Sequence, residues 1–144
     1  MYEQPKTAPA HRRPVARSHN SSLHTQDGPP STPGTQLTGH LAALHAATAA
    51  VRQGTDDPAQ QAELDAALKL IAARIGALAP TATVIRSEAT QVPAKSPAEL
   101  HDHAHALAGR LLVVAAARQD TATAMLACRR MDAHAAALST LRAG

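Results

Sequence analysis

Apolar residues recur every three or four positions in four separate segments of the chain. This spacing places them on one face of an α-helix. We therefore predict four helices, over about residues 35–53, 58–79, 97–118 and 121–142. Their apolar faces are Leu37, Leu41, Leu44, Thr48 and Val51; Leu64, Leu68, Ile71, Ile75 and Leu78; Leu100, Ala104, Leu107, Leu111 and Val114; and Cys128, Met131, Ala135 and Leu138.

Capping residues mark most of the helix ends. The clearest signal is Ser96-Pro97-Ala98-Glu99, in which the Ser96 hydroxyl and the Glu99 carboxylate can each accept a hydrogen bond from the other's backbone amide, with proline at the first helical position. The other signals are Gly54 after the first helix, Asp56 or Asp57 before Pro58 with Gln60 placed to close a second capping box, Pro80 after the second helix and Asp120 before the fourth.

Two helical hairpins of this kind make a four-helix bundle, so we predict an all-α fold. Residues 80–96 form a linker that either turns locally or runs the length of the bundle. No glycine or proline enforces the break near Gln119-Asp120-Thr121, so one continuous helix is the alternative to the second hairpin. The predicted core is aliphatic and includes Cys128 as a small core residue. Because that core is small, we also expect a homodimer.

Residues 1–34 have a different composition. They hold six of the ten prolines, together with Ser, Thr, Gln and His, and almost no large apolar residue. Such a segment cannot bury enough surface to offset its chain entropy, so we predict a disordered basic tail before a bundle over residues 35–144.

Composition and charge exclude several classes of function. The net charge of +3 is too small and too dispersed for a dedicated nucleic-acid surface, and Tyr2 is the only aromatic residue, so no platform exists for stacking bases. One cysteine excludes an internal disulfide. We see neither a signal peptide nor an apolar run long enough to span a bilayer, and so expect a cytoplasmic protein without membrane contact. The heavy use of alanine and arginine is typical of a GC-rich bacterial genome.

One short motif points to specific chemistry. His105-Ala106-Leu107-Ala108-Gly109, with the helix that follows it, resembles histidine phosphotransfer (HPt) four-helix-bundle domains over roughly residues 97–135. The resemblance implies that His105 accepts a phosphoryl group and that Gly109, one turn later, leaves room for an incoming partner. Ala108 stands where the family usually has lysine.

Histidines also suggest a metal site. His101 and His105 are four residues apart, a spacing at which two imidazoles can bind one metal ion. An antiparallel fourth helix would bring His134 level with His105, and Asp102 or His103 could add a ligand. If the first helix ran parallel to the third, His40 and His45 would lie at the same end.

No nucleophile with a neighbouring base, glycine-rich phosphate loop or paired carboxylate site is visible in the chain. We therefore expect a small cytoplasmic non-enzymatic helical protein that acts as a protein-interaction or regulatory module, with a protein partner of unknown identity and no cofactor. The alternatives are a histidine phosphotransfer module that uses His105, and a helical bundle that binds a divalent metal through His101, His105 and His134.

Overall fold

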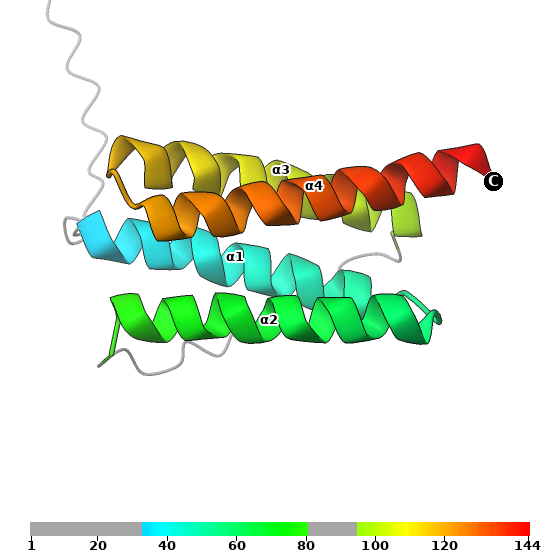
Figure 1. Ribbon diagram of the computed structural model, residues 1–144, viewed down its shortest axis with the longest axis horizontal. Helices are drawn as coiled ribbons and strands as arrows, with labels where there is room; N and C mark the ends of the chain where they lie inside the picture. The colour runs from blue at the N-terminus through cyan, green and yellow to red at the C-terminus, as the bar shows by residue number, and fades with distance from the viewer. Residues whose placement is uncertain (1–32, 81–94) are drawn as a thin grey trace, which may run out of the picture.

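The computed structural model describes residues 33–80 and 95–144, and it confirms the all-α four-helix bundle (Figure 1). The helices are α1 Pro33–Gln53, α2 Pro58–Leu78, α3 Pro97–Ala117 and α4 Thr121–Ala143. Each end lies within two residues of its predicted position. The described part of the chain contains no strand, and none of its helices has the length and hydropathy that a membrane crossing requires. The predicted tail, up to residue 32, and residues 81–94 of the linker lie outside the described residues.

The caps of three helices form largely as expected. The Ser96 amide donates to the Glu99 carboxylate at 2.7 Å, and the Glu99 amide donates to the Ser96 hydroxyl at 3.3 Å, which completes the capping box of α3. Asp57 caps α2 through the Ala59 amide. The predicted box between Asp57 and Gln60 was wrong, because the Gln60 side chain turns instead toward residues of other elements.

Helices α3 and α4 are separate, so the continuous-helix alternative is excluded. Gln119 lies between them with φ of 56°, in the left-handed region that residues other than glycine rarely adopt. Asp120 then caps α4, its carboxylate accepting from the Thr123 amide at 3.0 Å. The left-handed residue reverses the chain, and the cap starts the new helix.

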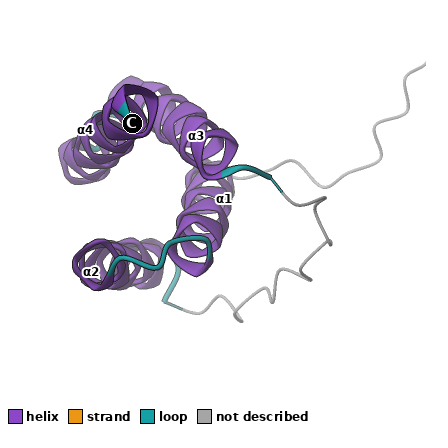
Figure 2. Cartoon of the chain, turned by 90° about the vertical axis from the view of Figure 1, so that its right-hand side faces the viewer, coloured by secondary structure: helices purple, strands orange, loops and turns teal. Residues whose placement is uncertain are grey.

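The chain order of the helices differs from their order in space. Seen along the helix axes, they follow the order α4, α3, α1, α2 around an arc, and α2 and α4 stand at its two ends (Figure 2). Helix α1 packs on α2 and α3, and α3 packs on α4, whereas α2 and α4 touch only sparsely. The bundle is therefore closed on three of its four sides by extensive helix packing and on the fourth by few contacts.

The two helices on either side of the linker, α2 and α3, end and begin at opposite ends of the bundle. A Cβ built on Gly54 would lie 3.1 Å from the Leu100 side chain, and Arg118 donates to Gln36 at 3.2 Å, so α1 and α3 are antiparallel. Helices α1 and α2 are also antiparallel. Leu78 and Pro97 therefore lie at opposite ends of a bundle roughly 31 Å long. The alternative in which the third helix begins beside the end of the second is excluded, and the path between them lies outside the described residues.

The core is aliphatic, and the α1 stripe is entirely buried as predicted. In α3 the most buried face is displaced from the predicted one, because α3 lies between α1 and α4 and meets both through its small residues while its larger ones flank them. Buried on α3 are His101, Ala104, Ala108, Leu111 and Ala115, whereas Leu100, Leu107 and Val114 are half-buried.

The face of α4 was predicted correctly only at Leu138, which is buried. Its buried residues are Thr123, Ala127, Arg130, His134 and Leu138, one position away from most of the predicted stripe. Cys128 is exposed and so is not a core residue. One residue turns a helix by about 100°. This error therefore moved the predicted interior to a different side of α4, and the physical reason is that the true interior face carries polar side chains.

Candidate functional site

Two histidines from different helices meet inside the bundle. The Nδ1 atoms of His101 on α3 and His134 on α4 lie 3.0 Å apart, and their rings pack edge to face with centroids 5.2 Å apart. His134 is completely buried and His101 almost so. At this distance one Nδ1 carries a proton and donates it to the other, so the two rings hold complementary tautomers.

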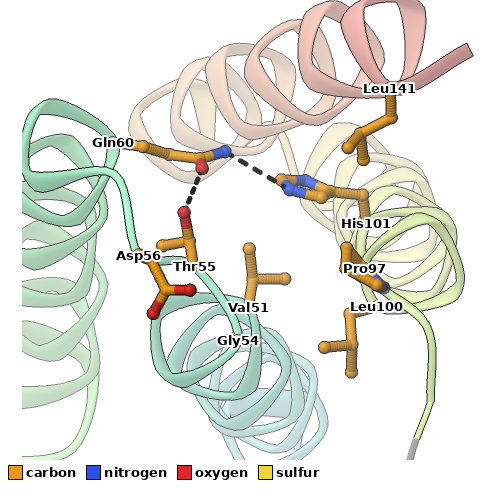
Figure 3. Close-up of a pocket in the computed structure, with 9 residues that line it drawn as sticks. All are labelled: Val51, Gly54, Thr55, Asp56, Gln60, Pro97, Leu100, His101 and Leu141. Carbon is orange, nitrogen blue, oxygen red and sulfur yellow. Dashed lines mark hydrogen bonds between the residues drawn. The ribbon is translucent and has the colours of Figure 1, made fainter. Parts of the chain in front are cut away.

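A chain of side-chain hydrogen bonds connects this pair to the turn between α1 and α2. The Thr55 hydroxyl contacts the Gln60 side-chain oxygen, and the Gln60 nitrogen lies 3.4 Å from His101 Nε2 (Figure 3). An amide nitrogen can only donate, so His101 Nε2 accepts and His101 Nδ1 carries the proton. His134 is then protonated on Nε2, an atom that is buried and has no partner among the described residues.

Both histidines are held neutral. Burial lowers the pKa of His134 to about 3, with further lowering from the positive charge of Arg130 and from the imidazoles of His101 and His105. Burial, followed by Arg130, also lowers the pKa of His101, and the carboxylates of Asp102 and Glu63 partly oppose this shift. At neutral pH the pair therefore adds polarity to the interior without adding charge.

A buried arginine stands beside the histidines. Arg130 on α4 is 5% exposed, and its guanidinium donates to the Glu63 carboxylate at 2.6 and 3.4 Å. Its Nε is buried with no partner in the described chain. The Glu63 side chain is half exposed, so the ion pair reaches from the interior to the surface of α2. A second bridge joins the same two helices, from Arg74 to Asp120 at 2.7 Å.

A small pocket opens next to His101, where the ends of α1 and α4 and the starts of α2 and α3 come together (Figure 3). Its volume is about 160 Å³. The side chains that line it include Val51, Leu100 and Leu141 on its apolar side and Asp56 and Gln60 on its polar side. The pocket gives the Gln60–His101 contact a route to solvent, whereas His134 behind it remains sealed.

A larger hollow of about 460 Å³ lies between α2 and α4. We call it the α2–α4 groove. Leu70 on α2 and Met125 on α4 are 55% and 53% exposed beside it, which is unusual for large apolar side chains within one concave surface. The complete lining is Leu70, Ala73, Arg74, Ala77, Ala122, Met125, Leu126 and Arg129. This groove is mainly apolar, unlike the polar site around His101.

The residues of the phosphotransfer motif are placed as follows. His105 is half-buried on α3 and makes no hydrogen bond within the described residues. Gly109 lies one turn later, where an added Cβ would first meet the Met131 methyl group at 3.9 Å. Ala108, in the position where the family usually has lysine, is completely buried. A lysine there could not reach solvent without leaving the core.

The predicted metal ligands are only partly brought together. His101 and His134 meet, and His105 is near enough to affect the pKa of His134. Within residues 33–80 and 95–144, no three His, Cys, Asp or Glu side chains converge to hold a metal ion. Asp102 instead pairs with Arg142 at 3.6 Å. The three-histidine metal site stays a prediction.

The remaining histidines named from the sequence lie apart from the pair. His103 is exposed on α3. Because α1 runs antiparallel to α3, His40 lies roughly 20 Å along the bundle from the level of His101. The parallel arrangement that would have brought His40 and His45 to His101 does not occur.

The roles of Arg130 and Gln60, which complete the polar site, were not predicted from the sequence. Arg130 could have been found from the spacing of Thr123, Arg130 and His134, which lie seven and then four residues apart on one helical face. Nothing local marks Gln60, whose role depends on a helix that begins 37 residues later.

Comparison of the chain with protein families, with curated proteins and with solved structures finds no match.

Proposed function

We propose that this chain is a protein-interaction module and that the α2–α4 groove is its binding face. The observation that carries the proposal is the difference in exposure between the apolar side chains beside α2 and α4, the two ends of the helical arc, and those at the other helix contacts. Helices α2 and α4 are joined by ion pairs and leave Leu70 and Met125 uncovered beside them, whereas the apolar clusters at the other three helix contacts consist of buried and half-buried side chains.

The free-energy balance supports this interpretation. Burying a leucine or methionine side chain stabilises a complex or a fold by roughly 1.5–3 kcal/mol. In the groove Leu70 and Met125 leave much of that stabilisation unused. Contiguous apolar surfaces with a polar rim are typical of binding sites. The polar site around His134, by contrast, is closed to ligands by its burial.

The test uses a photoreactive amino acid placed at Met125 in the full chain, expressed in the cells that naturally make it. The matched control places the same amino acid at Val113, which is 69% exposed on α3 and does not line the groove. We expect a cross-linked adduct of defined mass at position 125 that is absent at position 113 and disappears with Leu70→Asp. Equal labelling at both positions, or none at either, would contradict the proposal.

Phosphotransfer through His105 is the second candidate. It is supported by a histidine that is partly exposed and free of hydrogen bonds to the described residues, with glycine one turn later. Incubation with acetyl phosphate, or with a histidine kinase and a receiver domain, should then give an acid-labile label that His105→Gln abolishes and His103→Gln retains. If no such label forms under either condition, this candidate is rejected.

A further inference from the structure

The shape of the α2–α4 groove restricts what can occupy it. Its walls come from two antiparallel helices, α2 and α4, and its lining spans Leu70 to Ala77 on one and Ala122 to Arg129 on the other. Each span is eight residues, or roughly 10 Å of helix. Two helical turns of a third helix fit such a length, with anchors at positions i, i+4 and i+7.

Small side chains on the walls favour a helix as the occupant. Ala73, Ala77 and Ala122 line the groove between the larger Leu70 and Met125. Alanine lets a neighbouring helix axis come close, while the larger residues form the ridges between which its side chains pack. An extended strand would need unpaired backbone groups along the groove, and two helices offer none because their amides and carbonyls are bonded internally.

Charge distinguishes between partners. The groove lining contains two arginines and no carboxylate. Arg74 is already neutralised by Asp120, which accepts two hydrogen bonds of 2.7 Å from it. Arg129 has no ion-pair or hydrogen-bond partner within the described chain, so one uncompensated positive charge stands at the edge of an apolar surface. A partner with a carboxylate at this position gains a charge-assisted hydrogen bond.

A second copy of the chain fits this charge pattern less well. A two-fold interface joins the same patch of both copies. It would bring Arg129 of each copy into one interface whose lining supplies no carboxylate. Asp132, the next acidic residue along α4, does not line the groove. Like charges in a partly desolvated interface disfavour association.

Resting on the proposed function, we infer that the partner segment is an amphipathic α-helix that places two or three aliphatic side chains in the α2–α4 groove and an acidic side chain against Arg129. The bundle acquires a fifth helix along its weakly packed side. The aliphatic anchors supply most of the affinity, and the ion pair with Arg129 selects acidic helices over basic ones.

The experiment uses two fluorescent helical peptides with leucines at i, i+4 and i+7, one flanked by glutamates and the other by lysines. Binding to the full chain is measured by fluorescence anisotropy at low and high salt. We expect the glutamate peptide to bind about tenfold more tightly than the lysine peptide, a ratio that falls as salt rises. Arg129→Glu should reverse this preference, Leu70→Asp should abolish binding of both peptides, and Val113→Asp should change neither.

Several outcomes would overturn the inference. Equal binding of the two peptides, or a preference that Arg129→Glu leaves unchanged, would show that Arg129 does not select an acidic helix. A dimer in light scattering that Leu70→Asp dissociates would assign the groove to a second copy. Peptide binding that appears only after residues 81–94 are replaced by a glycine–serine linker of equal length would assign it to the chain itself. A specific adduct at position 125 together with failure of both peptides would reject the helix and retain the interaction module.

Discussion

Helices α1 and α4 run parallel in the same bundle, yet opposite kinds of side chain hold them in place. Helix α1 turns Leu37, Leu41, Leu44 and Val51 into the core, all of them buried. These contacts are non-directional, and each stabilises the fold in proportion to the apolar area removed from water. The attachment of α1 therefore depends on size and shape and varies little with pH.

Helix α4 presents a mostly polar face to the interior. It buries Thr123, Arg130 and His134, and its only fully buried apolar residues are Ala127 and Leu138. Hydrogen bonds and ion pairs are directional, and buried polar groups are costly when they lose a partner. The difference teaches that the contacts of α1 mainly stabilise the fold. The directional contacts of α4 fix its position against the neighbouring helices and make the stability of the fold depend on pH.

The largest effect should come from the α1 side. Leu44→Ala removes a fully buried side chain and leaves a cavity, so we expect the free energy of unfolding to fall by about 3 kcal/mol. Urea denaturation followed by circular dichroism measures this change. Val113→Ala, at an exposed site, is the matched control and should change the free energy by less than about 0.5 kcal/mol. If Leu44→Ala lowers the free energy of unfolding by less than about 1 kcal/mol, the apolar contacts of α1 are not the main source of stability.

The second prediction concerns acid sensitivity at His134. Below its ordinary pKa of 6.5 the unfolded chain takes up a proton at this position, whereas the folded chain takes it up only near a pKa of about 3. The stability present above pH 6.5 is therefore lost progressively as the pH falls across that window. We expect a loss of about 2 kcal/mol at pH of about 4.5, before most carboxylates titrate.

The measurement is the free energy of unfolding at several pH values, for the native chain and for His134→Leu. Since leucine does not titrate, this variant should lose less stability between neutral pH and pH of about 4.5 than the native chain does. His103→Leu, which replaces an exposed histidine on α3, should keep the native slope. Equal slopes in all three proteins would show that the buried pair does not control acid sensitivity.

The third prediction compares the two halves of the Arg130–Glu63 ion pair. Glu63→Ala leaves a buried guanidinium without its carboxylate and should cost about 2 kcal/mol. Arg130→Met keeps most of the buried volume and leaves a half-exposed carboxylate that water can solvate, so it should change stability by less than about 1 kcal/mol. Thermal unfolding of both variants measures the asymmetry. If both variants lose the same free energy of unfolding, the cost of breaking the ion pair does not depend on which partner is buried.

The smallest effect should be a gain. Gln119 adopts φ of 56° in the turn that begins α4, and glycine adopts this conformation without strain. Gln119→Gly should raise the free energy of unfolding by up to about 1 kcal/mol, because the relief of strain exceeds the added entropy of the unfolded chain. Gln53→Gly, at the helical end of α1, should lower it instead. If both variants lose stability equally, the turn at Gln119 is not strained.

Much of the fold was predictable, and the reason is local. The capping residues Ser96 and Asp120 start their helices through contacts within four residues, so their effect can be found in the sequence. The α1 stripe was predictable because its interior face is the apolar one. Large aliphatic residues at helical spacing have few alternatives to burial.

The candidate site was predictable only in part. The antiparallel hairpin of α3 and α4 was predicted, but His134 was expected level with His105, whereas in the structure it meets His101, one helical turn earlier. The interior face of α4 was misjudged because Arg130 and His134 are polar, while the more apolar Cys128 is exposed. A hydrophobic pattern cannot reveal a face whose burial is stabilised by hydrogen bonds with other helices.

By itself, the sequence determined the four helices, their ends and the aliphatic face of α1, because these features depend on interactions between residues a few positions apart. The tertiary structure alone decided that α1 and α3 run antiparallel, that α2 and α4 meet mainly through ion pairs, and that a groove between them exposes Leu70 and Met125. The physical reason is that helix direction and helix rotation depend on packing against distant residues, whose positions no local pattern contains.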